Sequence, residues 1–199
     1  MTSEMDGKDL AERVKLIENM MAAGRCSTES WGWSFVLWGV AYYVATAWAT
    51  WGQSNWAWPV TMVAAGVITT VMGARVSQGH PATTLGRAVG GVWTAVGTAM
   101  FVVLFSLAYS GHSNGHVSVA VAGALLGVAN GASAIILKWK MQFVCAVVWL
   151  ASTVIACFGS DDATQDAFLG AIFICQIVFG IYAMILESQR REQNGVAHA

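Results

Sequence analysis

Six apolar segments, each long enough to cross a bilayer and free of charged side chains, constrain this chain more than any other feature. They cover residues 31–51, 57–74, 88–109, 117–137, 141–159 and 167–186. A membrane-crossing helix needs about 20 mostly apolar residues. Only 11% of the 199 residues are charged, whereas a soluble domain carries about 25%. The sequence therefore predicts an all-α, polytopic integral membrane protein with six transmembrane helices.

The positions of the basic residues predict how these helices are oriented. The first, third and fifth loops of a six-span arrangement contain no Lys or Arg. All ten bases fall on the other side: Lys8, Arg13, Lys15, Arg25, Arg75, Arg87, Lys138, Lys140, Arg190 and Arg191. Because basic residues accumulate in cytoplasmic loops, both termini are expected in the cytoplasm, with the protein in a cell membrane of bacterial cytoplasmic type.

The N-terminal segment, residues 1–30, differs from the six-helix membrane domain, 31–186, and from the cytoplasmic tail, 187–199. Leu10, Val14, Ile17 and Met21 recur at helical spacing, which predicts an amphipathic helix over about residues 8–24. One interpretation is that this helix lies along the membrane surface or covers the inner helix ends. The other is that residues 8–24 bind a membrane protein, a cytoplasmic protein or a second copy.

Glycines at four-residue spacing mark two of the predicted helices as packing elements. Gly123, Gly127 and Gly131 share one helix face, and Gly86 and Gly90 begin a stripe that continues through Thr94 and Thr98. Small residues let two backbones approach closely in lipid, where no hydrophobic effect drives helices together. We expect the first face to contact a helix of the same chain, although a homo-oligomer is also compatible with it.

Four uncharged polar residues within the predicted spans suggest a polar cavity: Asn130, Gln176, Thr94 and Thr98. Each has a simpler interpretation as a group that hydrogen-bonds between helices. For Asn130, one residue before the end of the glycine stripe, the structural interpretation is the stronger one. The cavity remains the alternative.

The outer loops contain a weak metal-binding pattern. His112 and His116 are four residues apart, and aspartates lie near residue 161. Two glycines and an asparagine in that loop favour turns over the helix that would align the histidines, so no metal site is expected. Asp162 with Gln165 fits the capping pattern of a helix N-terminus.

The interior of every predicted span lacks Asp, Glu, Lys, Arg and His. Proton relays, ion-coupled transport and voltage sensing depend on such residues, as does carboxylate or metal chemistry within the bilayer. With a net charge of −1 and no phosphate-binding loop, no nucleic-acid partner is expected, and no cofactor either. The leading hypothesis is a non-enzymatic membrane protein that acts as a scaffold, accessory subunit or sensor, with membrane lipids around it. The alternative is a small transporter or channel for a neutral or apolar solute.

Overall fold

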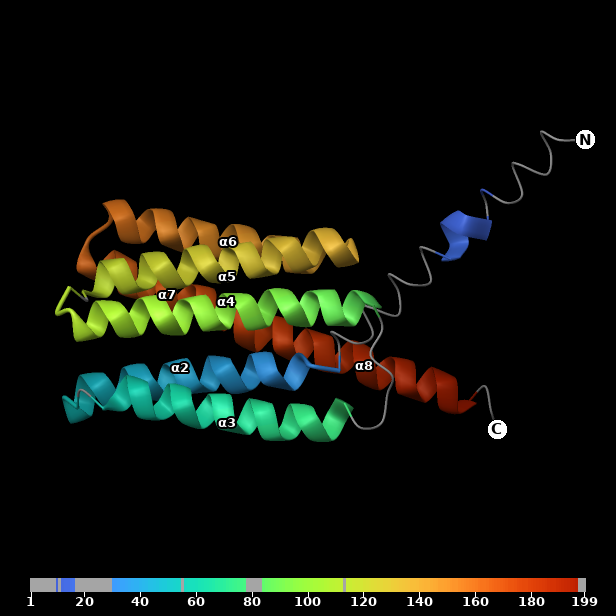
Figure 1. The fold of residues 1–199 in the computed structure, drawn as a ribbon, viewed down its shortest axis with the longest axis horizontal. Coiled ribbons are helices and arrows are strands. Elements are labelled where there is room, and N and C mark those ends of the chain that lie inside the picture. The colour runs from blue at the N-terminus through green and yellow to red at the C-terminus, as the bar shows by residue number, and fades with distance from the viewer. Residues whose placement is uncertain are drawn as a thin grey trace, which may run out of the picture.

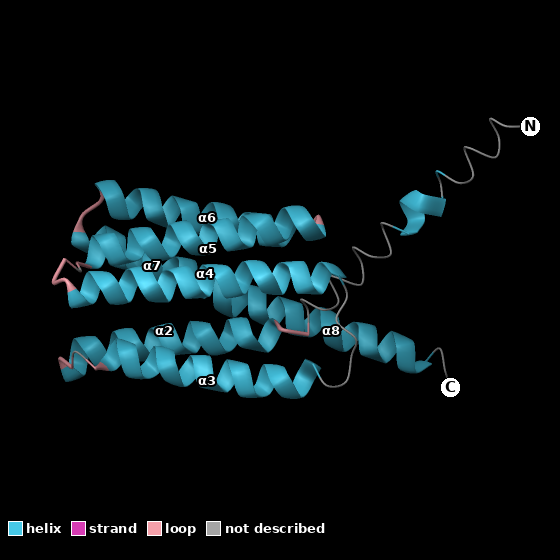
Figure 2. Ribbon diagram, viewed as in Figure 1, coloured by secondary structure: helices cyan, strands magenta, loops and turns pink. Residues whose placement is uncertain are grey.

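Long helices run side by side through most of the chain (Figure 1). A computed structural model describes residues 10, 12–16, 30–54, 56–77, 84–112 and 114–196. Of these residues 92% are helical and none forms a strand (Figure 2). The elements are α2 (Gly32–Gly52), α3 (Ala57–Ser77), α4 (Thr84–Tyr109), α5 (Gly115–Leu137), α6 (Lys140–Phe158), α7 (Asp161–Ile172), the π-helical segment η1 (Phe173–Val178) and α8 (Phe179–Val196).

Five of these helices are long and apolar enough to cross a membrane. They cover Ala57–Arg75, Thr84–Tyr109, Gly115–Leu137, Lys140–Phe158 and Asp161–Arg190. The remaining long helix, α2, has 21 residues but includes four Trp and two Tyr. These amphipathic rings lower its hydropathy, so α2 falls short of the other five although its length would suffice.

The last predicted helix is longer than the apolar pattern indicated. We expected residues 167–186, but α7, η1 and α8 follow one another without a break from Asp161 to Val196. The predicted cap was also wrong, because Ser160 is the N-cap and its side chain accepts a hydrogen bond from the backbone N–H of Ala163 at 3.3 Å. Asp162 lies within the first turn, where its charge suits the helix N-terminus.

The other helix bounds lie within four residues of the predicted ones. In the N-terminal segment, Leu10 and residues 12–16 are helical, and Leu10, Val14 and Leu16 are exposed. The rest of the amphipathic helix predicted over residues 8–24, including Ile17 and Met21, lies outside the described residues.

Most helices that follow one another in the chain pack together, but among the described residues α3 and α4 do not. Helices α5 and α6 form the most extensive contact, α2 packs against α3, η1 and α8, and α4 packs against α5. The side chains of Trp149, Ile172 and Phe179 fill the core between α2, α6 and the last helix. Within the described part of the chain, α3 and α4 are not among the packed pairs, and their ribbons stand apart in Figure 1.

Candidate functional site

The glycine face of α5 lies against α6. A Cβ added to Gly123 would lie 2.6 Å from Thr153 Oγ1, and one added to Gly127 would lie 2.8 Å from Leu150 Cγ. Gly131 is less crowded, since its Cβ would meet the Cβ of Ala146 at 3.7 Å. These glycines are therefore occupied in packing within the chain.

The small-residue face of α4 has no such neighbour. A Cβ at Gly90 would meet nothing within 4 Å. The hydroxyl of Thr94 donates to the carbonyl of Gly90, and that of Thr98 to the carbonyl of Thr94, both at 2.8 Å. Both threonines are exposed, and their hydroxyls bond only within their own helix in the described structure. Among the described residues, this face of α4 is therefore not covered by another helix, whereas the glycine face of α5 is covered by α6.

A cleft of about 3020 Å³ lies between α2 and α3 on one side and α4 on the other. Small residues of both walls line it, among them Gly66 on α3 and Gly86, Gly90 and Gly97 on α4. Added Cβ atoms at Gly66 and Gly97 would also meet nothing within 4 Å. The cleft is therefore bounded by two helix faces whose backbones another molecule could approach closely.

Gln176 lies at the base of this cleft. Its side chain is only 2% exposed and lines the cleft, and its Oε1 has no hydrogen-bond partner among the described residues. It belongs to the π-helical segment η1, and such segments often occur at functional sites. Gly39 of α2 makes room for it, because a Cβ there would lie 3.0 Å from the Cβ of Gln176.

Aromatic rings form part of the lining of the cleft. Phe35 meets Trp93 edge-on, with ring centroids 5.4 Å apart, and meets Phe179 at 5.1 Å. Tyr42 contacts Trp58 at 6.1 Å and Phe168 at 5.9 Å. The Tyr42–Trp58 pair is tilted, and the other three pairs are edge-to-face, an arrangement that aromatic rings favour. This part of the lining is therefore aromatic and mainly apolar.

Only two of the four residues of the predicted polar cavity line the cleft. Gln176 and Thr94 both line the cleft, whereas Asn130 and Thr98 are not part of its lining. The Nδ2 group of Asn130 donates to the carbonyl of Leu126 at 2.8 Å, and its Oδ1 is buried without a partner in the described structure. Gln142 of α6, which sequence reasoning passed over, is fully buried with neither amide atom paired there.

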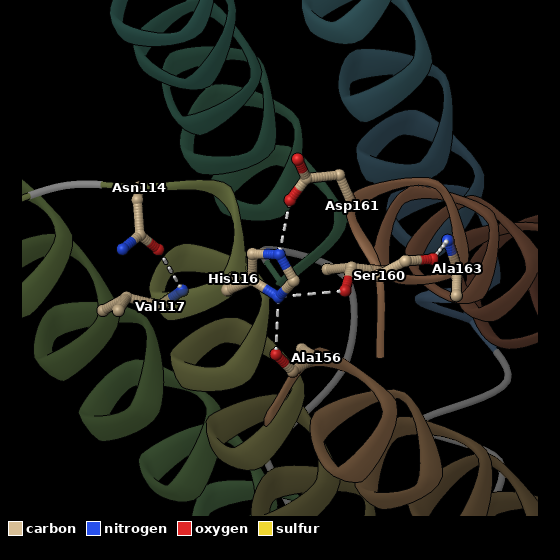
Figure 3. Close-up of polar contacts among 8 residues, drawn as sticks. Asn114, His116, Val117, Ala156, Ser160, Asp161 and Ala163 are labelled. Carbon is tan, nitrogen blue, oxygen red and sulfur yellow. Dashed lines mark hydrogen bonds and ion pairs between the residues drawn. The ribbon is translucent and has the colours of Figure 1, made fainter. Parts of the chain in front are cut away.

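A polar cluster around His116 lines one end of the cleft (Figure 3). The Nδ1 atom of His116 is 2.8 Å from the carbonyl oxygen of Ala156 and 3.2 Å from Thr164 Oγ1, and its Nε2 atom is 2.6 Å from Asp161 Oδ1. The ring thus joins α5 to the end of α6 and the start of α7. These bonds use both of its nitrogens.

The second histidine of the weak metal pattern has a different neighbour. His112 Nδ1 lies 3.2 Å from Ser110 Oγ. Among the described residues there is no group of three or more His, Cys, Asp or Glu side chains that could hold a metal ion. Beyond the His116 cluster the cleft offers apolar contact and, at its base, the amide of Gln176.

Glycines of α2 and the last helix were missed by sequence reasoning. A Cβ on Gly180 would lie 2.9 Å from the carbonyl oxygen of Gly32, and one on Gly32 would lie 2.9 Å from that of Gly180. Gly32 and Gly180 are far apart in the sequence, so no spacing within one helix could reveal this contact.

Comparison with protein-family models, curated proteins and solved structures finds no match for this chain.

Proposed function

We propose that this protein is a non-enzymatic integral membrane component, a scaffold or accessory subunit, whose cleft receives a transmembrane helix of a partner. In this proposal α2 crosses the membrane with the five more apolar helices, and both termini are cytoplasmic. The observation that carries it is the open cleft between α3 and α4, which are consecutive in the chain yet do not pack together.

The length of the cleft suits one helix. Its lining runs along α4 from Gly86 to Ala108, a stretch of about 33 Å at a rise of about 1.5 Å per residue. A helix of 20 residues is about 30 Å long. The glycines at 66, 90 and 97 would let the backbone of such a helix come close, which is how helices associate in lipid.

The distribution of charge supports the proposed topology. The loops α2–α3, α4–α5 and α6–α7 lie at one end of the bundle, and the α5–α6 turn lies with the C-terminal part of α8 at the other end (Figure 1). Arg75, Arg87, Lys138, Lys140 and Arg190 belong to the second end. The positive-inside rule assigns that end to the cytoplasm.

Two neighbouring glycines of α4 provide the test. Gly90 lines the cleft, while Gly91 does not, and neither has an atom within 4 Å of an added Cβ. We expect Gly90→Leu to release the partner helix and Gly91→Leu to retain it, because only the first side chain would project into the cleft. The measurement is the mass of the particle extracted in native lipid discs. A wild-type particle containing a single chain, or equal behaviour of the two variants, would refute the proposal.

A second candidate function is the binding or passage of a neutral or apolar solute. The cleft favours it because its lining runs from His116 and Asp161 at one end of the bundle to Arg87 and Arg190 at the other. Gln176 would then contact the solute. Solute flux into liposomes should fall when Gln176 is replaced by Leu; flux that survives this change excludes the path.

A further inference from the structure

Resting on the proposed function, we infer that the helix in the cleft is α4 of a second copy of this chain, in a symmetric dimer. A two-fold axis beside α4 would place the partner's α4 between α3 and α4 of the first copy. The same operation places α4 of the first copy in the partner's cleft. The order of helices across the interface becomes α3, partner α4, α4, partner α3.

This arrangement fills both clefts with a single kind of contact. Symmetric dimers use the same surface on both subunits, so no complementary face is left unused. Helix α4 is the one most available for it, since 6% of its most apolar stretch is buried within the chain, against 44% for α5. Its cleft face carries Gly86, Gly90 and Gly97, so two copies of this face could approach closely across the axis.

The depth of two polar residues supports the same arrangement. The ring of Phe35 contacts both Trp93 and Phe179. Thr94 follows Trp93, and Gln176 precedes Phe179 by three residues, so Thr94 and Gln176 lie within about one helical turn of the same depth. Two copies inserted in one membrane share their orientation, so their two-fold axis is normal to the bilayer and preserves depth.

The partner's Thr94 would therefore arrive at the level of Gln176. Its hydroxyl is a hydrogen-bond donor that can turn from its own helix, and Gln176 Oε1 is a buried acceptor without a partner in the described structure. A buried acceptor left unpaired lowers stability. Dimer formation would pair it, which gives the interface a polar contact as well as close packing.

Cross-linking at Thr94 tests the identity of the partner. Single cysteines at Thr94 and Ala95 would be introduced into the full chain after Cys26, Cys145, Cys157 and Cys175 are replaced by Ala. Thr94 lines the cleft beside the proposed axis, whereas Ala95 is exposed outside the cleft lining. We expect oxidation in native membranes to join two chains through Thr94→Cys and to leave Ala95→Cys as single chains.

Two glutamine variants test the hydrogen bond separately from folding. Gln176→Leu should raise the dimer dissociation constant about threefold to tenfold, as expected for one interhelical hydrogen bond in lipid, while the helical content of the chain is retained. Gln142→Leu is the control, because Gln142 is equally buried and has both amide atoms unpaired in the described structure but does not line the cleft. It should leave the dissociation constant unchanged.

The outcomes separate this inference from the proposed function. A cross-link from Thr94→Cys to a different polypeptide would overturn the second-copy assignment and leave the scaffold function standing. A single chain with lipid as the only occupant of its cleft would overturn both. Equal cross-linking of the Thr94 and Ala95 variants, or equal effects of the two glutamine variants, would also overturn the dimer described here.

Discussion

Two glycines on the same face of α5 differ in the space that surrounds them. At Gly123 an added Cβ would approach Thr153 Oγ1 to 2.6 Å and the backbone oxygen of Trp149 to 3.0 Å. At Gly131 the nearest atom would be the Cβ of Ala146 at 3.7 Å, an ordinary contact. The requirement for glycine is therefore strict at one position and weak at the other.

This difference predicts opposite effects of the same substitution. Gly123→Ala should lower the free energy of unfolding by about 1 to 3 kcal/mol, the usual cost of overpacking. Gly131→Ala should raise it by about 0.5 to 1 kcal/mol, because Ala is the better helix former. Unfolding of both variants by denaturing detergent in mixed micelles would measure this. Equal losses would mean that the α5–α6 contact is less close than described.

At the scale of elements, the short connection between α5 and α6 requires a left-handed backbone conformation at Lys138. This residue has φ 48° and ψ 47°, and the backbone N–H of Trp139 donates to the carbonyl of Ala134 at 3.0 Å. A left-handed conformation is unfavourable for a residue with a Cβ. The turn therefore forms although Lys138 is less suited than glycine to its left-handed backbone conformation.

Lys138→Gly should accordingly stabilise the protein by about 1 kcal/mol. The matched control is Lys140→Gly, which places glycine in the first turn of α6 and should destabilise it, since glycine is a poor helix former. Thermal unfolding of the two variants in detergent gives the comparison. A loss of stability with Lys138→Gly would show that the lysine side chain outweighs its backbone strain.

The start of α7 gives a second prediction for an element. Ser160→Ala should cost about 1 kcal/mol, because it removes the oxygen that accepts from the Ala163 N–H. Asp162→Ala should cost only a few tenths of a kcal/mol, since it removes a charge near the helix N-terminus without removing the cap. If the larger loss came from Asp162→Ala, the predicted cap at Asp162 would replace the one described.

For the whole molecule, the proposed topology predicts which residues each side of the membrane can reach. Cysteines at Ser110 and Asp162, exposed at one end of the bundle, should react with a membrane-impermeant maleimide on intact cells. Cysteines at Arg75 and Lys140, exposed at the other end, should react only after permeabilisation. Labelling of all four on intact cells, or the reverse pattern, would contradict the assignment of the basic end to the cytoplasm.

By itself the sequence determined the all-helical class and most of the helix bounds. Charge-free stretches of spanning length are a local property, because each can be recognised without its neighbours. Both bounds of the last helix were predicted wrongly for the same reason. Polar residues such as Asp162 and Gln165 continue the helix beyond its apolar stretch, so the apolar pattern is shorter than the helix itself.

Only the tertiary structure decided which small and polar residues have partners. The glycines of α5 and α4 have similar spacing, yet Gly123 lies against α6 and Gly90 faces an open cleft. Asn130 and Gln176 are both buried amides, but only Gln176 lines that cleft. Spacing fixes which side chains share a helix face, whereas what that face meets depends on helices distant in the chain.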